Sequence, residues 1–372
     1  MSALFSPFRL AGLTLDNRIV VSPMCQYSAE NGSATDWHVM HLGQLALSGA
    51  GLLIVEATAV EPRGRISPHC LGLYSDDNEA ALARVLAAVR AHGKAKLGIQ
   101  LGHAGRKASV EVPWRGNKPL APAAGGWPTI GPSAVSYAEG WPAPAPLDRA
   151  GMDALVAAFV RSTERALRLG FDLIELHGAH GYLISEFLSP IANKRTDEYG
   201  GSLENRMRFP LEIAKAVRAA WPRERALGVR LNGTDWAEGG IVVAEAAAFA
   251  AALKEIGVDY ACVSGGGNSP AQKIPVEAHY QVPYAAEVRR RSGIVTMAVG
   301  MIADPRAADR IVAAGEADLV ALARGFLDDP RWAWHAAEAL DEELAVVVQY
   351  ERARPKLWPG ARLVRPALHP SA

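Results

Sequence analysis

Eight short apolar runs of strand length, each separated from the next by a longer segment, most constrain the fold of this chain. The runs cover residues 18–24, 51–58, 96–101, 171–177, 226–232, 259–266, 295–300 and 317–324. Nearly continuous apolar strands are typical of a parallel sheet, because such a sheet is buried on both faces. Eight strands alternating with helical patterns predict an α/β fold, a single (β/α)8 TIM barrel, rather than a doubly wound sheet of five or six strands.

The segments between the strands are alanine-rich and amphipathic, and several carry a signal for the end of a helix. Three predicted helices end at a glycine: residues 76–92 at Gly93, 148–169 at Gly170 and 242–256 at Gly257. Each glycine is expected to adopt the left-handed backbone that commonly ends a helix.

The Pro-, Gly- and Trp-rich segment 113–146 is predicted to be an insertion after the third strand. A last helical stretch covers residues 330–340. We therefore expect a barrel over residues 1–340 and a C-terminal tail over residues 341–372, whose structure periodicity does not predict.

Charge balance and cysteine usage exclude several function classes. Lys plus Arg and Asp plus Glu both number 39, so no overall field attracts nucleic acid or an anionic membrane. Cys25, Cys70 and Cys262 form no CxxC pair, which argues against a disulfide framework and an iron–sulfur site. Without an apolar signal segment at its start, the chain is expected to stay in the cytoplasm.

Reacting groups of a TIM barrel lie at the carboxyl ends of its strands. Gly300 and Arg324 follow the seventh and eighth runs, the places where such barrels often hold a phosphate group. This pairing predicts a phosphorylated cofactor across the barrel mouth. Arg230, in the fifth run, would be a buried cation that needs an anionic partner if it points inward.

The fourth run ends in ELHGAHGYL, which groups His177, His180 and Tyr182 within six residues. As zinc ligands the two histidines need a third ligand, and Glu175 is poorly placed to supply it. As hydrogen-bond donors they would form a clamp on a carbonyl oxygen, with Tyr182 as a proton source. Packing at a strand end is the structural alternative for a single histidine.

These segments resemble the old yellow enzyme family of FMN-dependent ene-reductases, in its bacterial YqjM-like and xenobiotic-reductase-like branch. The resemblance rests on VVSPMCQYSA, IQLGHAGRKAS and, above all, HGAHGYLISEFLSPIANKRTDEYGGSLENR, and it extends over residues 4–340.

The resemblance implies the following site residues. FMN would be bound by Pro23, Met24, Cys25, Ala57, Gln100, His177, Arg230, Gly300 and Arg324. The substrate would be bound by Cys25, Tyr27, His177, His180, Tyr182 and Arg352. The ending QYER resembles the family's C-terminus, whose arginine enters a neighbouring subunit's active site, so Arg352 is the candidate for that role.

The implied activity is that of an NADPH dehydrogenase or ene-reductase with non-covalent FMN and NADPH or NADH as electron donor. Its substrates would be electrophilic alkenes: α,β-unsaturated carbonyl, nitro or maleimide compounds, reduced in a ping-pong cycle by hydride from FMN N5 to the β-carbon. His177 and His180 would hold the activating oxygen, and Tyr182 would protonate the α-carbon. A homodimer or homotetramer is expected.

Two other function classes stay open on the sequence alone. One is a zinc-dependent barrel hydrolase that uses His177 and His180 as ligands. The other is a non-catalytic flavin- or ligand-binding barrel, although binding alone needs no proton donor such as Tyr182.

Overall fold

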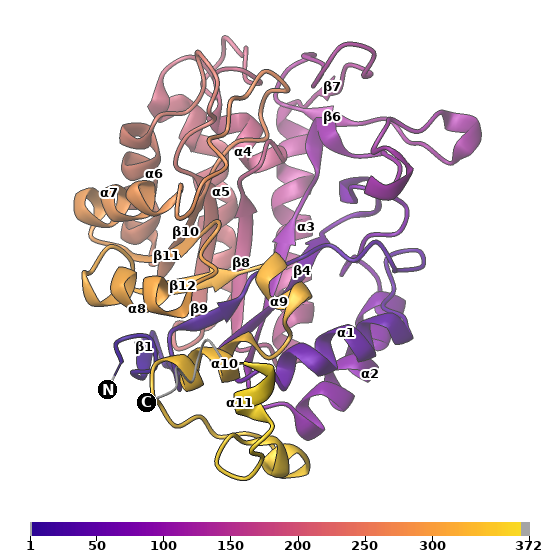
Figure 1. Cartoon of the computed structure of the whole chain (residues 1–372). Coiled ribbons are helices and arrows are strands. Elements are labelled where there is room, and N and C mark those ends of the chain that lie inside the picture. The colour runs from indigo at the N-terminus through magenta and orange to yellow at the C-terminus, as the bar shows by residue number, and fades with distance from the viewer. Residues whose placement is uncertain (1, 366–372) are drawn as a thin grey trace.

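The computed structural model describes residues 2–365 and confirms the predicted barrel (Figure 1). Its eight strands are β3 (Ile19–Val21), β4 (Leu52–Ala59), β5 (Lys96–Gly102), β8 (Leu173–Gly178), β9 (Ala226–Asn232), β10 (Tyr260–Ser264), β11 (Val295–Val299) and β12 (Leu319–Leu322). Each strand pairs in parallel with the next one along the chain, and β12 pairs with β3 to close the barrel. All eight carboxyl ends therefore lie at one edge.

Helices cover the outside of the barrel. The longer ones are α1 (Asp36–Ala46), α2 (Asp76–His92), α3 (Arg149–Arg168), α5 (Leu203–Ala220), α6 (Val243–Ile256), α7 (Val282–Ser292), α8 (Pro305–Ala313) and α10 (Trp332–Ala339). Two short helices, α4 (Leu183–Leu188) and α9 (Arg324–Asp328), follow β8 and β12. The ends of the three helices predicted from glycines agree with the structure to within one residue.

The prediction of left-handed backbone is confirmed for two of the three glycines and wrong for the third. Gly170 and Gly257 have φ of 73° and 91°. Gly93 instead has φ −75° and ψ 148°, which is extended backbone. The connection from α2 to β5 is so short that the chain extends at once, and the next amide, of Lys94, donates to the carbonyl of Ala46.

Two apolar layers hold the barrel together. Outward-facing strand residues such as Ile174 and Val229 pack against the helices in one large cluster. Inward-facing residues such as Leu173, Cys262 and Met297 form a second cluster inside the barrel. This alternation along each strand explains why the strands read as continuous apolar runs.

A small hairpin at the amino end of the chain closes the bottom of the barrel. Its strands β1 (Phe8–Leu10) and β2 (Leu13–Leu15) are antiparallel. Leu10, Leu13 and Leu15 are buried in the same cluster as the barrel interior. The sequence does not predict this hairpin, because strands of three residues show too little alternation of apolar and polar side chains.

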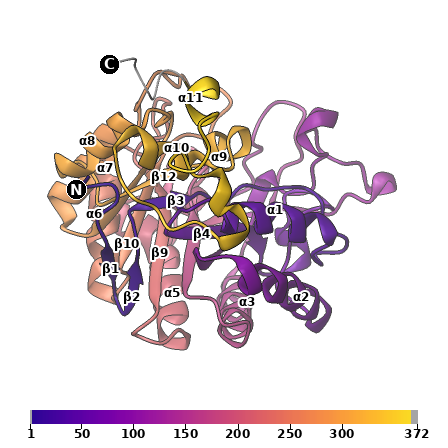
Figure 2. The same ribbon diagram turned by 60° about the horizontal axis from the view of Figure 1, so that its bottom comes forward.

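The insertion and the tail lie at opposite ends of the molecule (Figure 1). The insertion lies between β5 and α3 and holds a two-stranded parallel pair, β6 (Ile130–Gly131) and β7 (Ala145–Pro146). The tail forms a 3-10 helix, η5 (Val348–Ala353), and a short helix, α11 (Ala361–Val364), beside α10 (Figure 2).

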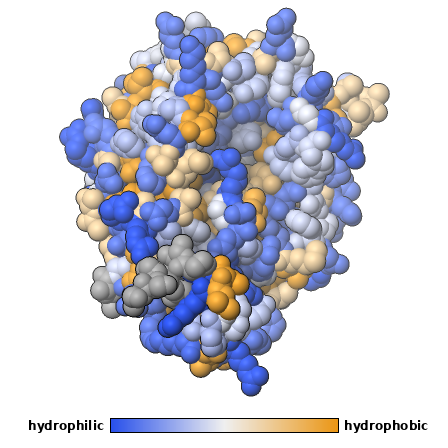
Figure 3. All heavy atoms as spheres, in the orientation of Figure 1, coloured by the Kyte–Doolittle hydropathy of each residue, from blue (hydrophilic) through white to orange (hydrophobic). Residues whose placement is uncertain are grey.

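The surface visible in Figure 3 is mainly hydrophilic, with small apolar areas between. No helix within residues 2–365 is both long and apolar enough to cross a membrane.

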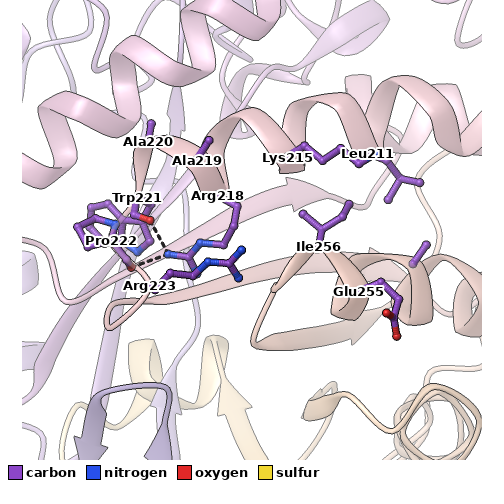
Figure 4. A pocket seen from close by; sticks show the side chains of 11 residues that line it. Leu211, Lys215, Arg218, Ala219, Ala220, Trp221, Pro222, Arg223, Glu255 and Ile256 are labelled. Atoms are coloured by element: carbon purple, nitrogen blue, oxygen red, sulfur yellow. Dashed lines mark hydrogen bonds between the residues drawn. The ribbon is translucent and has the colours of Figure 1, made fainter.

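A groove of about 870 Å³ lies between the ends of α5 and α6 (Figure 4). Arg218 closes one side by donating to the carbonyls of Trp221 and Pro222 at 2.7 and 2.6 Å. Because helices run antiparallel to the barrel strands, the carboxyl ends of α5 and α6 lie at the amino edge of the barrel. The groove is therefore remote from the predicted site residues.

We predict opposite effects for two glycine-to-alanine substitutions. A Cβ at Gly228 would lie 2.0 Å from the ring of Tyr260 inside the barrel. Gly228→Ala should therefore lower the free energy of unfolding by about 1–3 kcal/mol. A Cβ at Gly43 in α1 meets no atom within 4 Å, so Gly43→Ala should add up to about 1 kcal/mol through helix propensity. Thermal unfolding midpoints check both, and equal shifts in the same direction would contradict the packing argument.

Candidate active site

The residues predicted to bind the cofactor come from seven of the eight strands or the loops directly after them. Pro23, Met24 and Cys25 follow β3, Ala57 lies in β4, Gln100 in β5, His177 in β8 and Arg230 in β9, and Gly300 and Arg324 follow β11 and β12. The remaining strand, β10, contributes Ser264, whose hydroxyl lies 2.8 Å from Nε2 of His180. Closure of the barrel thus gathers the predicted residues around its carboxyl edge.

An irregularity in β4 decides which side chain of that strand faces inward. The register with β5 shifts between Val55 and Ala57, so Ala57 pairs with Gln100 and Glu56 is the extra residue of a β-bulge. The Glu56 carboxylate accepts a hydrogen bond from the backbone amide of Gln26 at 3.0 Å, and its other oxygen lies 3.4 Å from Nε2 of His38. Glu56 therefore holds the loop after β3 instead of facing the barrel interior.

His177, His180 and Tyr182 form one compact group, as the sequence indicated. The ring of His177 lies 5.1 Å from that of His180 and 5.0 Å from that of Tyr182, centroid to centroid. Both neighbouring rings stand nearly perpendicular to the imidazole of His177. The three side chains therefore pack together as one polar and aromatic group at the end of β8.

A sharp turn of the backbone produces this grouping. His180 has φ 61° and Gly181 has φ 69°, both in the left-handed region. A Cβ at Gly181 would lie 2.0 Å from the carbonyl oxygen of Gly267, so only glycine allows the loops after β8 and β10 to touch. The amide of His180 donates to Oδ1 of Asn232 at 3.0 Å, which fixes the turn.

Lys107 also supports this turn. Its ammonium donates to the carbonyls of His180 and Gly267 at 2.8 and 3.1 Å. The same ammonium lies 5.0 Å from the ring centroid of Tyr182 and 4.8 Å from that of Tyr137. Burial lowers the pKa of Lys107 to about 8. No sequence signal ties this lysine to a turn some 70 residues away.

Burial sets the protonation states of the group. It lowers the pKa values of His177 and His180 well below their usual range, and the nearby cations Arg230 and Lys107 lower them further. Burial also raises the pKa of the Tyr182 hydroxyl well above its usual value. At neutral pH the site therefore holds two neutral imidazoles and a protonated phenol, all able to donate hydrogen bonds.

Arg230 points into the barrel and is only 8% exposed. Its Nη1 donates to the Ser22 hydroxyl at 3.1 Å, but its buried Nε has no hydrogen-bond partner within residues 2–365. The nearby Glu175 carboxylate instead accepts from Gln100 at 2.7 Å and from Tyr260 at 2.9 Å. A buried cation with an unused N–H group fits an anionic ligand at the barrel mouth.

Gly300 and Arg324 end neighbouring strands, so they share one part of the rim. Gly300 has φ 112°, which requires glycine. The Arg324 side chain is exposed and has no hydrogen-bond or ion-pair partner among the described residues. Both features fit the predicted phosphate group, which needs close backbone approach and an available cation.

Cys25, Tyr27 and Tyr182 all pack against one small apolar cluster. Burial raises the pKa of the Cys25 thiol well above its usual value, so the thiol is neutral. Cys25, Cys70 and Cys262 are all free.

Arg352, in contrast, does not lie near the other predicted site residues. It lies exposed on η5, in the tail. Figure 1 shows this tail at the end of the molecule opposite β6 and β7. Arg352 therefore cannot act in the site of its own chain.

No group of three or more His, Cys, Asp or Glu side chains within residues 2–365 is arranged to hold a metal ion. The histidine pair thus lacks the further ligands that a zinc hydrolase needs.

Comparison with known proteins decides between the open function classes. Residues 3–343 match the model of the NADH:flavin oxidoreductase / NADH oxidase family. The chain belongs to this family. Membership confirms the predicted oxidoreductase class and FMN as its cofactor.

The relatives agree with this assignment. The chain is 45% identical to an NADPH dehydrogenase of Geobacillus sp. (strain WCH70), over 94% of this chain and 98% of that protein. It is 43% identical to an NADPH dehydrogenase of Listeria innocua, over 95% and 99%. Among solved structures, morphinone reductase superposes with a TM-score of 0.75 at 28% identity, covering 92% of this chain and 91% of the other.

The lowered pKa values of the site histidines predict how stability depends on pH. Below about pH 6.5 the unfolded chain binds protons at these positions and the folded chain does not. The free energy of unfolding should therefore fall as the pH drops from 6.5 towards 5. His180→Asn should reduce this slope, by at most about 1.4 kcal/mol per pH unit.

Urea unfolding at several pH values, at one fixed FMN concentration, measures these slopes. His69→Asn is the matched control, because the His69 side chain is exposed and lies outside the histidine group of the site. An unchanged slope in His180→Asn would show that His180 titrates normally in the folded protein.

Proposed function

We propose that this protein reduces carbon–carbon double bonds activated by a carbonyl, nitro or imide group, with NADPH as the electron donor. The observation that carries the proposal is the convergence of two neutral imidazoles and a protonated phenol beside the buried Arg230. The names of the relatives, NADPH dehydrogenase and morphinone reductase, support a reductive reaction on a small molecule.

The residues around the rim would hold FMN. Arg230 and Gln100 would bind the polar edge of its ring system, Ala57 and the backbone of Pro23 and Met24 would lie against the ring, and Gly300 and Arg324 would bind the phosphate. The unused Nε–H of Arg230 is the strongest support for this assignment. When bound, FMN supplies a hydride at N5 to the β-carbon of the substrate.

His177 and His180 would bind the activating oxygen of the substrate. As neutral imidazoles they can each donate one hydrogen bond. For His180 this requires that Nε2 accepts from the Ser264 hydroxyl, so that the N–H is at Nδ1 and can donate to the substrate. Negative charge develops on this oxygen as the β-carbon is reduced. Donors already aimed at that point stabilise the transition state more than the ground state.

Tyr182 would complete the reaction by transferring its hydroxyl proton to the α-carbon. Its raised pKa keeps that proton in place until the carbanion character of the substrate is high. Cys25 and Tyr27 would line the same pocket. NADPH and the alkene would occupy this pocket in turn, which gives ping-pong kinetics.

Arg352, in our proposal, enters the site of a neighbouring subunit in a homodimer or homotetramer. Support comes from its exposure and from the packing of η5, where Tyr350 lies 5.9 Å from the ring of Trp334 and so anchors the segment. The assembly and the location of the protein in the cytoplasm stay predictions.

The central test compares NADPH oxidation by the FMN-loaded protein without oxygen, with and without 2-cyclohexenone. We expect rapid, enone-dependent oxidation that is about 10²-fold slower in Tyr182→Phe, because the phenylalanine cannot deliver a proton. Turnover of a strongly activated nitroalkene should fall less, because its nitronate can leave and be protonated in water. Equal losses for both substrates would rule out Tyr182 as the proton donor.

Replacing Arg352 should affect substrate binding and not the fold. Arg352→Ala should raise KM for the alkene or NADPH several-fold while the FMN content stays unchanged. Arg362→Ala, another exposed arginine of the tail, is the matched control and should leave KM as it is. Steady-state kinetics that are identical in the wild type and Arg352→Ala would confine the complete active site to one chain.

A further inference from the structure

The insertion after β5 carries a short hairpin whose base lies beside the candidate site. Val110 and Pro119 form an antiparallel bridge. The Glu111 amide donates to the Lys118 carbonyl at 2.9 Å, and the Leu120 amide donates to the Ser109 carbonyl at 2.8 Å. Val110 is buried in the apolar cluster against which Cys25, Tyr27 and Tyr182 pack. The site and the base of the hairpin therefore share one packed unit.

The tip of this hairpin places Trp114 against a predicted substrate-binding residue. Trp114 lies in a 3-10 turn, η3 (Pro113–Arg115), that ends at Gly116 in the left-handed conformation. Its ring centroid lies 5.8 Å from that of Tyr27, and the two ring planes meet at 88°. The two aromatic rings thus form a right-angled apolar corner next to the pocket.

Trp114 differs from the other aromatic side chains that the insertion contributes. The Trp127 indole donates to the Arg63 carbonyl at 2.9 Å. Trp141 packs on Tyr137 with 4.9 Å between ring centroids. The Trp114 indole makes no hydrogen bond within residues 2–365, and 68% of the residue is exposed. Its large apolar face is available to a ligand.

We propose that Trp114 and Tyr27 form a subsite for a flat apolar group, above all an aromatic ring, attached to the activated alkene. A ring in this corner can stack on one side chain and meet the edge of the other, the two arrangements that aromatic pairs prefer. The substrate class would be alkenes with an aryl substituent remote from the reacting carbons. This inference rests on the proposed function, which it deepens by naming a feature of the substrate.

The test uses two substrates that share the reacting alkene and differ in one remote group, N-phenyl-2-methylmaleimide and N,2-dimethylmaleimide. Trp114→Ala should lower kcat/KM for the N-phenyl compound by about tenfold, mainly through KM, because the lost contacts bind ground state and transition state alike. For the N-methyl compound kcat/KM should change less than about twofold. Trp114→Phe should recover most of the loss.

Met40→Ala serves as the control for removing an exposed apolar side chain, because Met40 is 62% exposed on α1 and has no place in the proposed site. Its kinetics with both maleimides should equal those of the wild type. FMN content and the mass of the assembly are measured for every variant.

The outcomes separate the two proposals. Equal losses for both maleimides in Trp114→Ala, or a changed mass of the assembly, would overturn the subsite and assign Trp114 a structural role. Wild-type protein that reduces neither maleimide nor 2-cyclohexenone would overturn the proposed function itself. Wild-type protein that reduces both maleimides with no difference between wild type and Trp114→Ala would overturn the subsite alone.

Discussion

Pairing of β12 with β3 is the constraint on which the whole arrangement depends. Once this last pair forms, the strands have no free edge and their carboxyl ends meet in a ring. Residues as far apart as Cys25 and Arg324 then lie around one opening. Successive side chains of each strand face inward and outward in turn. Near this opening the inward-facing side chains are polar, and the outward-facing ones are apolar and pack against the helices.

The inside of the barrel changes character along its axis. At the amino end, Leu10 and Leu13 of the hairpin close an apolar layer. Above it, the Glu175 carboxylate accepts from Gln100 and from the Tyr260 hydroxyl, so the three side chains form one hydrogen-bonded layer. At the level of Arg230 the buried Nε has no partner among the described residues, and there the candidate site begins.

The sequence predicts the features that follow from local pattern and from strand order. The eight apolar runs, the ends of the longer helices and the group of His177, His180 and Tyr182 belong to this class. Contacts between distant segments could not be predicted, such as Lys107 under the turn at His180 or Trp114 against Tyr27. The structure of the tail could not be predicted either. It depends on the packing of Tyr350 on Trp334, and the tail sequence has no periodicity that indicates this contact.

The extra residue in β4 has an electrostatic consequence. In a regular strand Glu56 would take the place of Ala57 opposite Gln100, and a second carboxylate would stand beside Glu175 in the layer below Arg230. That second carboxylate would compete with a bound anion for the guanidinium of Arg230. Because the bulge turns Glu56 towards Gln26 and His38, the guanidinium of Arg230 stays available to a ligand bound at the barrel mouth.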